Sequence, residues 1–339
     1  MENQTHRQQI AGIADPLIRQ QKDGITPSEA ATLAQMPEAA TPDLLYAAFN
    51  VTRAFEKADI FTCSIINAKS GRCSQDCAFC AQSAHHDTPV AIYPLMGMDE
   101  MVSRAIEMDR MGAGHFSMVT SGYGLDTSEI DTICAAAARI REKTALTVCC
   151  SPGMLPKEHA EKLAASGVTH FHHNLETAKS YFPAVCSTHP YKEDIQALQT
   201  AAAAGLKVCT GGILGLGESW QQRIELAFDL KELNADRIPL NFLNPIAGTQ
   251  MGDRSLMAPM EALKSIALFR LIHPRTDITI CGGREATLGD YQSWIFLAGA
   301  NGLMVGNYLT TRGRDGRTDM AMIRQWEDLG GASHGRRSR

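Results

Sequence analysis

Three cysteines stand close together in the segment that begins at residue 73. Cys73, Cys77 and Cys80 form a C-x3-C-x2-C pattern. Thiolates at this spacing can each bind one iron of a [4Fe-4S] cluster, which leaves the fourth iron without a ligand from the pattern. An open iron suits a bidentate ligand such as the amino and carboxylate groups of S-adenosylmethionine (SAM). The pattern therefore predicts a cluster that binds SAM.

A structural zinc site is the alternative for the same cysteines. Zinc in closed sites takes four ligands, and His85 or His86 could supply the fourth. The aromatic residue Phe79, which precedes the last cysteine, favours the cluster, and we expect Phe79 to belong to the cofactor site.

Composition limits the class of protein and its surroundings. The chain has 339 residues, of which 44% are hydrophobic, so it can bury a large core. Its net charge is −5 and basic residues cluster only at the last few positions, which argues against nucleic acid as a partner. The N-terminus is polar and no apolar stretch is long enough for a membrane span, so we expect a cytoplasmic protein. In a reducing compartment, ten cysteines indicate metal binding or catalysis rather than disulfides.

Hydrophobic periodicity predicts the elements that must position these cysteines. Residues 1–58 show helical, amphipathic spacing. From about residue 60, short β-type runs alternate with helical stretches. The predicted strands are Phe61–Ile66, His115–Thr120, Leu146–Cys150, Val168–His173, Leu206–Ile213, Arg237–Leu243, Ile278–Cys281 and Gly302–Gly306. The predicted helices are Asp99–Met111, Thr127–Lys143, Pro156–Ser166, Lys192–Ala204, Trp220–Leu233, Pro259–Ile272, Leu288–Gly299 and Met320–Asp328.

Eight strands alternating with eight helices indicate an α/β fold, a (β/α)8 TIM barrel with an N-terminal helical extension. In such barrels, chemistry takes place at the C-terminal ends of the strands. We predict an extension over residues 1–58, the barrel over 59–329 and a disordered tail over 330–339, which is rich in Gly, Ser and Arg.

Six segments, in order and at matching spacing, resemble those of the biotin synthase family. They are 64–83, which holds the three cysteines, 171–177, 208–218, 239–243, 282–285 and 298–302. The resemblance implies a radical SAM enzyme. In this family, one electron from the [4Fe-4S] cluster cleaves SAM into methionine and a 5′-deoxyadenosyl radical. The radical removes hydrogen from C9 and then C6 of dethiobiotin, and sulfur from a second cluster closes the ring of biotin.

The resemblance also assigns site residues. Ser121 and Gly122 match the segment that receives the SAM amino group, and Asn174 and Glu176 match the pair that holds the ribose hydroxyls. His189 lies where the family has a residue near the SAM carboxylate. The predicted substrate residues are Asn174, which also faces dethiobiotin, Asn241, which binds the ureido ring, and His172, which replaces an asparagine of many relatives.

A second cluster is implied as well, and here the sequence departs from the family. The usual [2Fe-2S] cluster is held by three cysteines and one arginine. Cys149, Cys209 and Arg284 match three of these ligands, but Ser117 stands where the third cysteine is expected. Serine is a poor ligand for iron, so the usual set lacks one thiolate.

Two further cysteines lie on predicted strands. Residues two apart on a strand share a face, and the neighbours at that spacing are small enough to leave room for a cluster in several cases. The pairs are Cys149 with Thr147, Cys209 with Gly211, Cys281 with Thr279 and Cys63 with Ile65. We therefore expect Cys63, Cys149 and Cys209 to bind an auxiliary cluster of another type, such as a four-iron cluster with an extra sulfide. Cys281 stays open between ligand and packing, because Gly282-Gly283 can bend the strand. Cys134, Cys150 and Cys186 are predicted to pack as small hydrophobes.

The sequence also leads to expectations about binding partners, and it leaves other functions open. The resemblance implies a flavodoxin- or ferredoxin-type electron donor, iron–sulfur assembly machinery and a homodimer. Two other functions remain open: a radical SAM enzyme related to hydrogenase maturases or methylornithine synthases, and a non-catalytic iron–sulfur or zinc protein. Asn241, Cys149, Cys209 and Arg284 together favour sulfur insertion.

Overall fold

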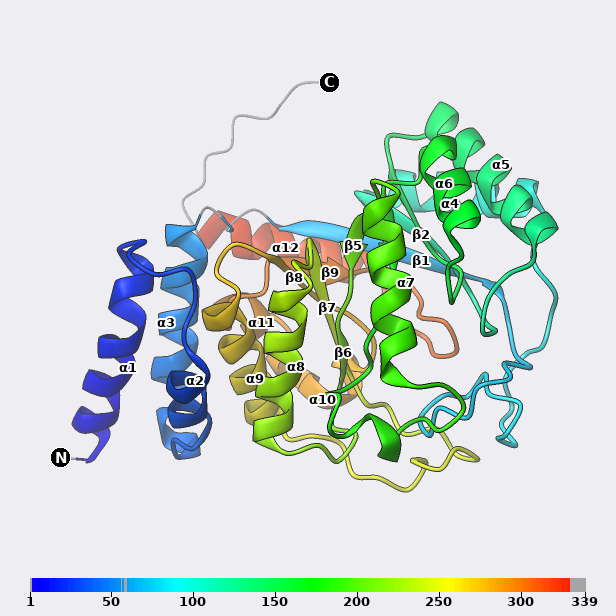
Figure 1. Cartoon of the computed structure of the whole chain (residues 1–339). Coiled ribbons are helices and arrows are strands. Elements are labelled where there is room, and N and C mark those ends of the chain that lie inside the picture. The colour runs from blue at the N-terminus through cyan, green and yellow to red at the C-terminus, as the bar shows by residue number, and fades with distance from the viewer. Residues whose placement is uncertain (1, 56, 58–59, 330–339) are drawn as a thin grey trace.

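Parallel strands form a closed barrel inside a ring of helices (Figure 1). The structure is a computed structural model that describes residues 2–55, 57 and 60–329. The strands in this part of the chain are β1 (Phe61–Lys69), β2 (His115–Thr120), β3 (Thr147–Ser151), β4 (His170–His172), β5 (Lys207–Cys209), β6 (Gly212–Leu214), β7 (Arg237–Phe242), β8 (Asp277–Ile280) and β9 (Gly302–Met304).

The sheet closes between β5 and β7. The strand order is β5-β4-β3-β2-β1-β9-β8-β7-β6, every pairing is parallel, and β5 also pairs with β7. β5 and β6 are two parts of one strand, separated by Thr210 and Gly211. A Cβ at Gly211 would overlap the carbonyl oxygen of Pro239 on β7, so only glycine fits at this break. With β5 and β6 counted together, the described residues confirm the predicted eight-stranded (β/α)8 barrel.

Helices connect the strands, and one predicted helix is wrong. The helices of the described residues are α1 (Glu2–Ile18), α2 (Pro27–Ala34), η1 (Glu38–Ala40), α3 (Thr41–Ala54), α4 (Met98–Met111), α5 (Thr127–Lys143), α6 (Lys157–Ser166), η2 (Phe182–Ala184), α7 (Tyr191–Ala203), α8 (Trp220–Glu232), α9 (Pro259–Ile272), α10 (Arg284–Leu288), η3 (Gly289–Tyr291), α11 (Trp294–Leu297) and α12 (Gly316–Leu329). The single helix predicted over Leu288–Gly299 is replaced by three short ones. Gly289 breaks the helical path there, because its φ is +49°.

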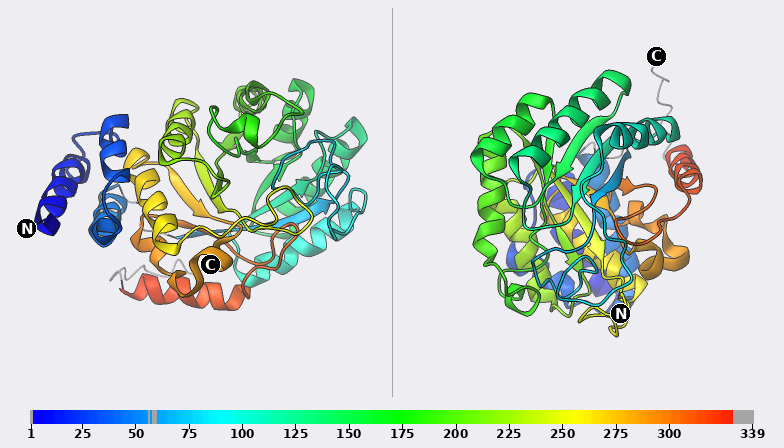
Figure 2. Two further views of the ribbon diagram at one scale, coloured as in Figure 1. Left: turned by 90° about the horizontal axis from the view of Figure 1, so that it is seen from below. Right: turned by 90° about the vertical axis from the view of Figure 1, so that its right-hand side faces the viewer.

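The N-terminal helices lie against the outer wall of the barrel (Figure 2). α3 packs on α9, and α1 packs on α3. Ile10 and Leu17 of α1 belong to the same continuous hydrophobic core as the barrel strands. The division into extension and barrel therefore stays a prediction, and the tail predicted over 330–339 lies outside the described residues. None of the helices in the described ranges is both long and apolar enough to cross a membrane.

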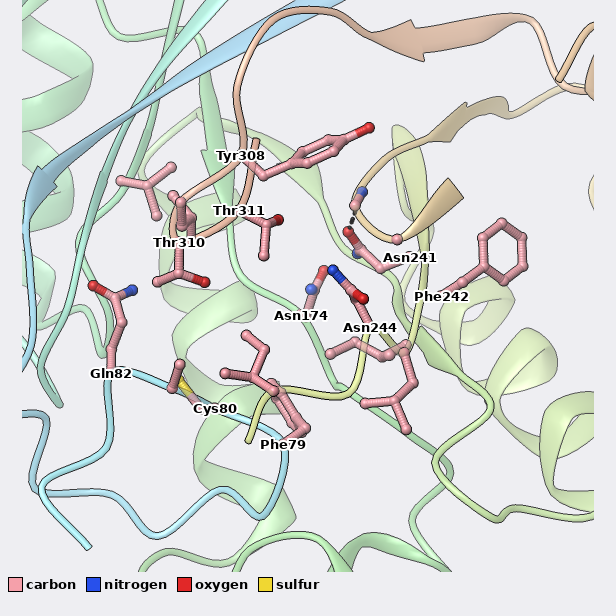
Figure 3. A pocket seen from close by; sticks show the side chains of 18 of the residues that line it. Phe79, Cys80, Gln82, Asn174, Asn241, Phe242, Asn244, Tyr308, Thr310 and Thr311 are labelled. Atoms are coloured by element: carbon pink, nitrogen blue, oxygen red, sulfur yellow. Dashed lines mark hydrogen bonds between the residues drawn. The ribbon is translucent and has the colours of Figure 1, made fainter. Parts of the chain in front are cut away.

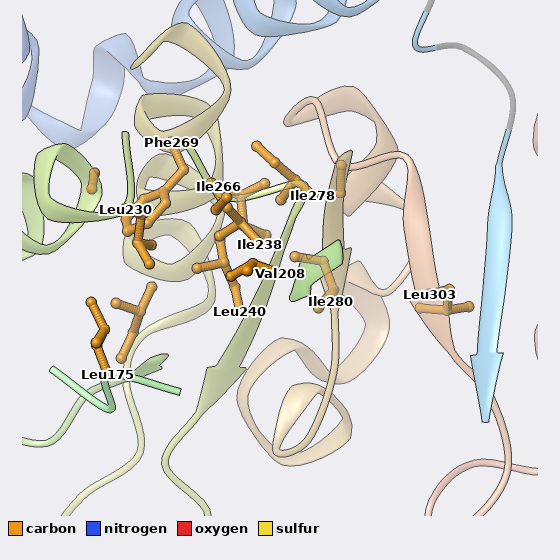
Figure 4. Packing of buried hydrophobic residues seen from close by; sticks show 14 of the residues in the cluster. Leu175, Val208, Leu230, Ile238, Leu240, Ile266, Phe269, Ile278, Ile280 and Leu303 are labelled. Atoms are coloured by element: carbon orange, nitrogen blue, oxygen red, sulfur yellow. The ribbon is translucent and has the colours of Figure 1, made fainter. Parts of the chain in front are cut away.

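Strand alternation separates the core from the barrel interior. Ile238 and Leu240 of β7 point outward and pack with β8 and the helices α8 and α9 (Figure 4). The alternate residues of the same strand, Arg237, Pro239 and Asn241, line cavities inside the barrel instead. A period of two along β7 thus sends Ile238 and Leu240 to the helices and the alternate residues to the interior.

Buried hydrogen bonds from Arg270 of α9 stabilise this side of the barrel. The side chain is fully buried, and its guanidinium donates hydrogen bonds to the carbonyl oxygens of Gly299, His273, Pro274 and Thr276 and to the side chain of Asn301. We expect Arg270→Met to lower the free energy of unfolding by about 3–5 kcal/mol, because buried acceptors lose their donor.

Chemical denaturation of the purified protein measures this loss. Arg139→Met is the matched control, because Arg139 is exposed and pairs only with Glu142 on its own helix. Equal unfolding midpoints for the two variants would contradict the role given to Arg270.

Candidate functional site

The loop that carries Cys73, Cys77 and Cys80 (the loop cysteines) follows β1 and is held by one buried glutamine. The side-chain carbonyl of Gln82 accepts hydrogen bonds from Asn67 Nδ2 (3.1 Å), Ser70 Oγ (3.0 Å) and the backbone N–H of Gly71 (3.3 Å). The backbone of Gln82 also accepts a hydrogen bond from the N–H of Cys73. All three loop cysteines line one cavity, the first cavity, at the C-terminal end of the barrel.

The surroundings of the loop cysteines bear on the alternative of a zinc site. Within the described residues, no three His, Cys, Asp or Glu side chains lie close enough together to hold one metal ion. In a [4Fe-4S] cluster each thiolate binds its own iron, so wider spacing is required. Neither His85 nor His86 lines the first cavity, and each has a ring nitrogen within 3.1 Å of a backbone carbonyl oxygen of the loop.

Asp76 ties the cluster loop to the segment before α7. Its carboxylate accepts hydrogen bonds from the N–H groups of Ser187 (2.9 Å) and Thr188 (3.2 Å) and from both hydroxyls. Although burial opposes ionisation, the hydrogen bonds from Ser187 outweigh it and hold the pKa of Asp76 well below its usual range. The carboxylate therefore keeps its charge and fixes Cys77 relative to this segment.

Asp76→Ala should loosen this connection. We expect the free energy of unfolding to fall by about 1–3 kcal/mol and iron to leave the reconstituted protein faster, because several backbone donors lose a charged acceptor. Iron release to a chelator under anaerobic conditions measures the effect, with the exposed Asp99 of α4 as the control position (Asp99→Ala). Iron release at the same rate from both variants would show that Asp76 does not restrain the loop.

The first cavity also contains all the residues predicted to contact SAM except Phe79. Ser121, Gly122, Asn174, Glu176 and His189 line it together with the loop cysteines. The prediction for Phe79 needs correction, because its side chain lines the neighbouring second cavity and not the first. Phe79 lies beside Cys80, which lines both cavities (Figure 3).

Glu176 occupies a strained backbone position. Its φ is +62°, and its carbonyl oxygen accepts a hydrogen bond from the N–H of Ile213 on β6 (2.8 Å). Such a conformation is uncommon for residues other than glycine and is concentrated at functional sites. Burial raises the pKa of the Glu176 carboxyl to about 7, while Asn174 Nδ2 donates to it at 3.3 Å. A ligand with neighbouring hydroxyl groups would supply the donors that this carboxylate lacks.

His189 is held as a cation. Its Nε2 lies 3.3 Å from Asp194 Oδ1, and its Nδ1 lies 2.8 Å from Gln75 Oε1. Burial alone lowers the pKa of His189, but its hydrogen bonds to Asp194 and Cys186 outweigh burial and raise the pKa to about 10. An imidazolium on the wall of the first cavity can attract a carboxylate.

Sequence reasoning missed the surroundings of His189. The buried Asp194 also accepts a hydrogen bond from His173 at 2.8 Å, so one carboxylate orients two histidines. The prediction that Cys186 packs as a small hydrophobe is wrong in part. It is buried, but its sulfur lies 3.3 Å from both Asp76 Oδ1 and His189 Nδ1.

The second cavity adjoins the first and contains the predicted substrate residues (Figure 3). Asn174 and His172 line both cavities, and Asn241 lines the second. The side-chain amide of Asn241 donates to the carbonyl of Gly212 (3.3 Å) and accepts from the N–H of Gly282 (3.0 Å). Both ends of the Asn241 amide are therefore hydrogen-bonded to backbone groups. The polar lining residues that sequence reasoning missed are Gln82, Asn244, Tyr308, Thr310 and Thr311.

The third cavity lies deeper in the barrel and is lined by four thiols. Cys63, Cys149, Cys209 and Cys281 (the auxiliary cysteines) all face it, and Ser117 does as well. Cys150, beside Cys149, points the other way into the hydrophobic core, as strand alternation requires. His172 lines all three cavities, so they meet at this residue.

Unpaired polar atoms show that the third cavity fits a polar group. Ser117 Oγ, Thr279 Oγ1 and Arg237 Nε are buried and have no hydrogen-bond partner. Burial raises the pKa of each auxiliary cysteine, to about 12 for Cys209. Binding to iron removes such thiol protons, and the sulfides of a cluster accept hydrogen bonds. The donors and thiols present therefore fit an iron–sulfur cluster.

Comparison with known proteins agrees with this geometry. Residues 68–230 match the family model "Radical SAM superfamily", and residues 239–327 match "Biotin and Thiamin Synthesis associated domain". The chain is 53% identical to a biotin synthase of Syntrophus aciditrophicus, over 92% of this chain and 96% of the relative. It is 49% identical to the biotin synthase of Geotalea uraniireducens, over 89% of this chain and 92% of the relative. The chain belongs to the biotin synthase family.

Solved structures show the same fold at low identity. Methylornithine synthase (PylB) superposes with a TM-score of 0.78 at 18% identity, over 94% of this chain and 96% of that one. The hydrogenase maturase HydG superposes with a TM-score of 0.79 at 16% identity, over 94% of this chain and 74% of that one. These likenesses confirm the barrel fold.

One residue that the biotin synthase family resemblance placed in the auxiliary site lies elsewhere. Arg284 does not line the third cavity. Its buried guanidinium bonds to Asp319 and to Gln292 Oε1 (2.6 Å). Gly283 before it has φ +78°, which turns the chain away from the barrel interior at the start of α10. The arginine that faces the auxiliary cysteines is Arg237, which sequence reasoning missed.

Proposed function

We propose that this chain inserts sulfur between C6 and C9 of dethiobiotin and so forms biotin. The observation that carries the proposal is the meeting of three cavities at His172. One cavity has the loop cysteines, one has a polar amide at Asn241, and one has the auxiliary cysteines. Family membership at about half identity over most of the chain supports the same activity.

The first cavity would bind SAM between the loop cysteines and β2–β4. When bound, the [4Fe-4S] cluster supplies the electron that cleaves SAM into methionine and a 5′-deoxyadenosyl radical, and the auxiliary cluster supplies the sulfur. The backbone at Ser121 and Gly122 would receive the amino group of SAM. Glu176, helped by Asn174, would accept hydrogen bonds from the ribose hydroxyls, and the His189 cation would attract the carboxylate.

The second cavity would hold dethiobiotin beside SAM. Asn241 can donate to the carbonyl oxygen of the ureido ring and accept from a ring N–H, which matches a cyclic urea. His172 contacts Asn174 Oδ1 through Nε2 at 3.0 Å, and burial lowers its pKa to about 4, so it stays neutral. Phe79 forms part of the wall of this cavity. An enclosed pocket keeps water away from a reactive radical.

The third cavity would hold a cluster bound by the auxiliary cysteines. Four thiols, with serine and threonine hydroxyls between them, support a four-iron cluster with an extra sulfide rather than the [2Fe-2S] cluster of the family. A flavodoxin- or ferredoxin-type protein would supply electrons, and iron–sulfur assembly machinery would load the clusters. We also expect a homodimer in the cytoplasm.

The test is an anaerobic reaction of the reconstituted protein with dethiobiotin, SAM and a strong reductant. We expect biotin and 5′-deoxyadenosine, both measured by mass spectrometry. 5′-Deoxyadenosine without biotin would instead indicate a radical SAM enzyme with another substrate. Absence of both products from protein with full iron content would contradict the proposal altogether.

A further inference from the structure

Arg237 is the cationic residue that lines the third cavity together with the auxiliary cysteines. It is the first residue of β7, it is 6% exposed, and it lines the third cavity. Its Nη1 lies 3.6 Å from Cys63 Sγ, and its Nη2 lies 3.2 Å from His115 Nε2. The guanidinium stacks over the ring of Phe61 at 4.1 Å from the ring centre. These contacts leave the Nε–H buried without an acceptor.

The charge of Arg237 has no carboxylate partner. Among the described residues, no Asp or Glu forms an ion pair with Arg237. Asp277 on the neighbouring strand attracts Arg237 at longer range, but its carboxylate is held by Lys57 and Asn301, each at 2.9 Å. The neighbouring His115 and His170 cannot compensate this charge, because a histidine side chain is either neutral or cationic. A buried cation without a directly paired counter-ion is costly, so this arrangement favours an anion in the third cavity.

We propose that Arg237 is a positioning residue that supplies the counter-charge and N–H···S hydrogen bonds for a cluster bound through the four auxiliary cysteines. This inference rests on the proposed function, since it takes the third cavity as a cluster site. Iron ligation by thiolates makes the occupant an anion, which is the partner that Arg237 lacks.

Arg237 is not a ligand of the cluster. A guanidinium in its protonated form has five N–H donors and no lone pair to offer to iron, so a protonated Arg237 cannot bind iron. Two of its nitrogens are already directed at Cys63 and His115, and the aromatic ring of Phe61 fixes its plane. This role differs from the arginine ligand that the family resemblance implies.

Two physical effects follow from this placement. A fixed positive charge stabilises the more negative, reduced state of a cluster, and hydrogen bonds to its sulfurs act in the same direction. Arg237 therefore raises the midpoint potential of the auxiliary cluster. It also slows the loss of iron, since partners beyond the ligands typically change metal affinity by about 10- to 100-fold.

The experiment uses the full chain with all three loop cysteines replaced by alanine, so that spectra report the auxiliary cluster alone. Arg237→Lys keeps the charge, and Arg237→Gln keeps N–H donors without the charge. Arg223→Met is the control, because Arg223 is a buried arginine whose partners, Glu218 and Glu261, lie outside the third cavity. After anaerobic reconstitution, iron and sulfide content, Mössbauer spectra, iron release to a chelator and the midpoint potential are measured.

We expect Arg237→Gln to lower the midpoint potential and to release iron about tenfold faster, with unchanged Mössbauer parameters for thiolate-bound iron. Arg237→Lys should give values close to those of the parent, which is the protein with only the loop cysteines replaced. Arg223→Met should leave both values unchanged. A glutamine variant that equals the parent in potential and iron release would overturn the proposal. A change in the Mössbauer parameters of one iron, not rescued by lysine, would make Arg237 a ligand and overturn the positioning role. A parent that holds no iron would refute the auxiliary cluster itself, and this inference with it.

Discussion

Replacing the three loop cysteines together by alanine will abolish 5′-deoxyadenosine formation and leave the auxiliary iron in place. The two thiol sets line different cavities, so losing one set removes no thiol from the other. Alanine at the four auxiliary cysteines should give the reverse result, with SAM cleavage retained and biotin lost. Iron and sulfide analysis, together with mass spectrometry of both products, separates the two outcomes.

Cys150→Ala provides the control for these cysteine variants. Cys150 neighbours Cys149 in the chain but is 1% exposed within the hydrophobic core. We expect this variant to keep its full iron content and both products, with a small loss of stability from the lost packing. Loss of all iron from the loop-cysteine variant would refute a separate auxiliary cluster.

Asn241→Leu should raise the Kd for dethiobiotin by about 100-fold, because the pocket loses a donor and an acceptor for the ureido ring. The backbone groups of Gly212 and Gly282 that Asn241 engages would also lose their partner. SAM cleavage in the absence of dethiobiotin should be unaffected, since Asn241 does not line the first cavity. Binding of dethiobiotin in the presence of SAM can be measured by equilibrium dialysis.

Two further variants sharpen this test. Asn241→Asp keeps the shape and an acceptor but loses the N–H donor, so its affinity should lie between those of the wild type and the leucine variant. Asn50→Ala on α3 should leave the Kd for dethiobiotin unchanged, because Asn50 lines none of the three cavities. An unchanged Kd for Asn241→Leu would remove Asn241 from the substrate site.

Much of the barrel could be predicted because its strands have a strict period of two. Small neighbours and the family resemblance together led us to expect Cys149 inward and Cys150 as packing, and the structure places both as expected. Cys281, left open because of the glycines after it, also faces the third cavity. The strand is still regular up to Ile280, so the bend comes one residue too late to reverse its direction.

The residues that were misplaced or missed are those whose side-chain direction the local sequence does not determine. Arg284 follows a left-handed glycine, and a motif match cannot show to which side the next helix carries a side chain. Arg237 was overlooked because an arginine at the start of a strand is usually exposed, and only closure of the sheet between β5 and β7 buries it. Asp194 orients His173 and His189 across a turn of chain, a tertiary contact that no sequence spacing reveals.

The shared wall between the second and third cavities has a consequence for repeated turnover. Ile65, His172 and Met304 line both spaces, so the substrate pocket borders the auxiliary cysteines directly. At the other end, Arg237 lies over the ring of Phe61, and His115 contacts the same ring edge-on. We expect iron and sulfide that repair the auxiliary cluster to enter by the path that dethiobiotin uses. Repair and catalysis would then alternate, and product retained in the pocket would delay the next round.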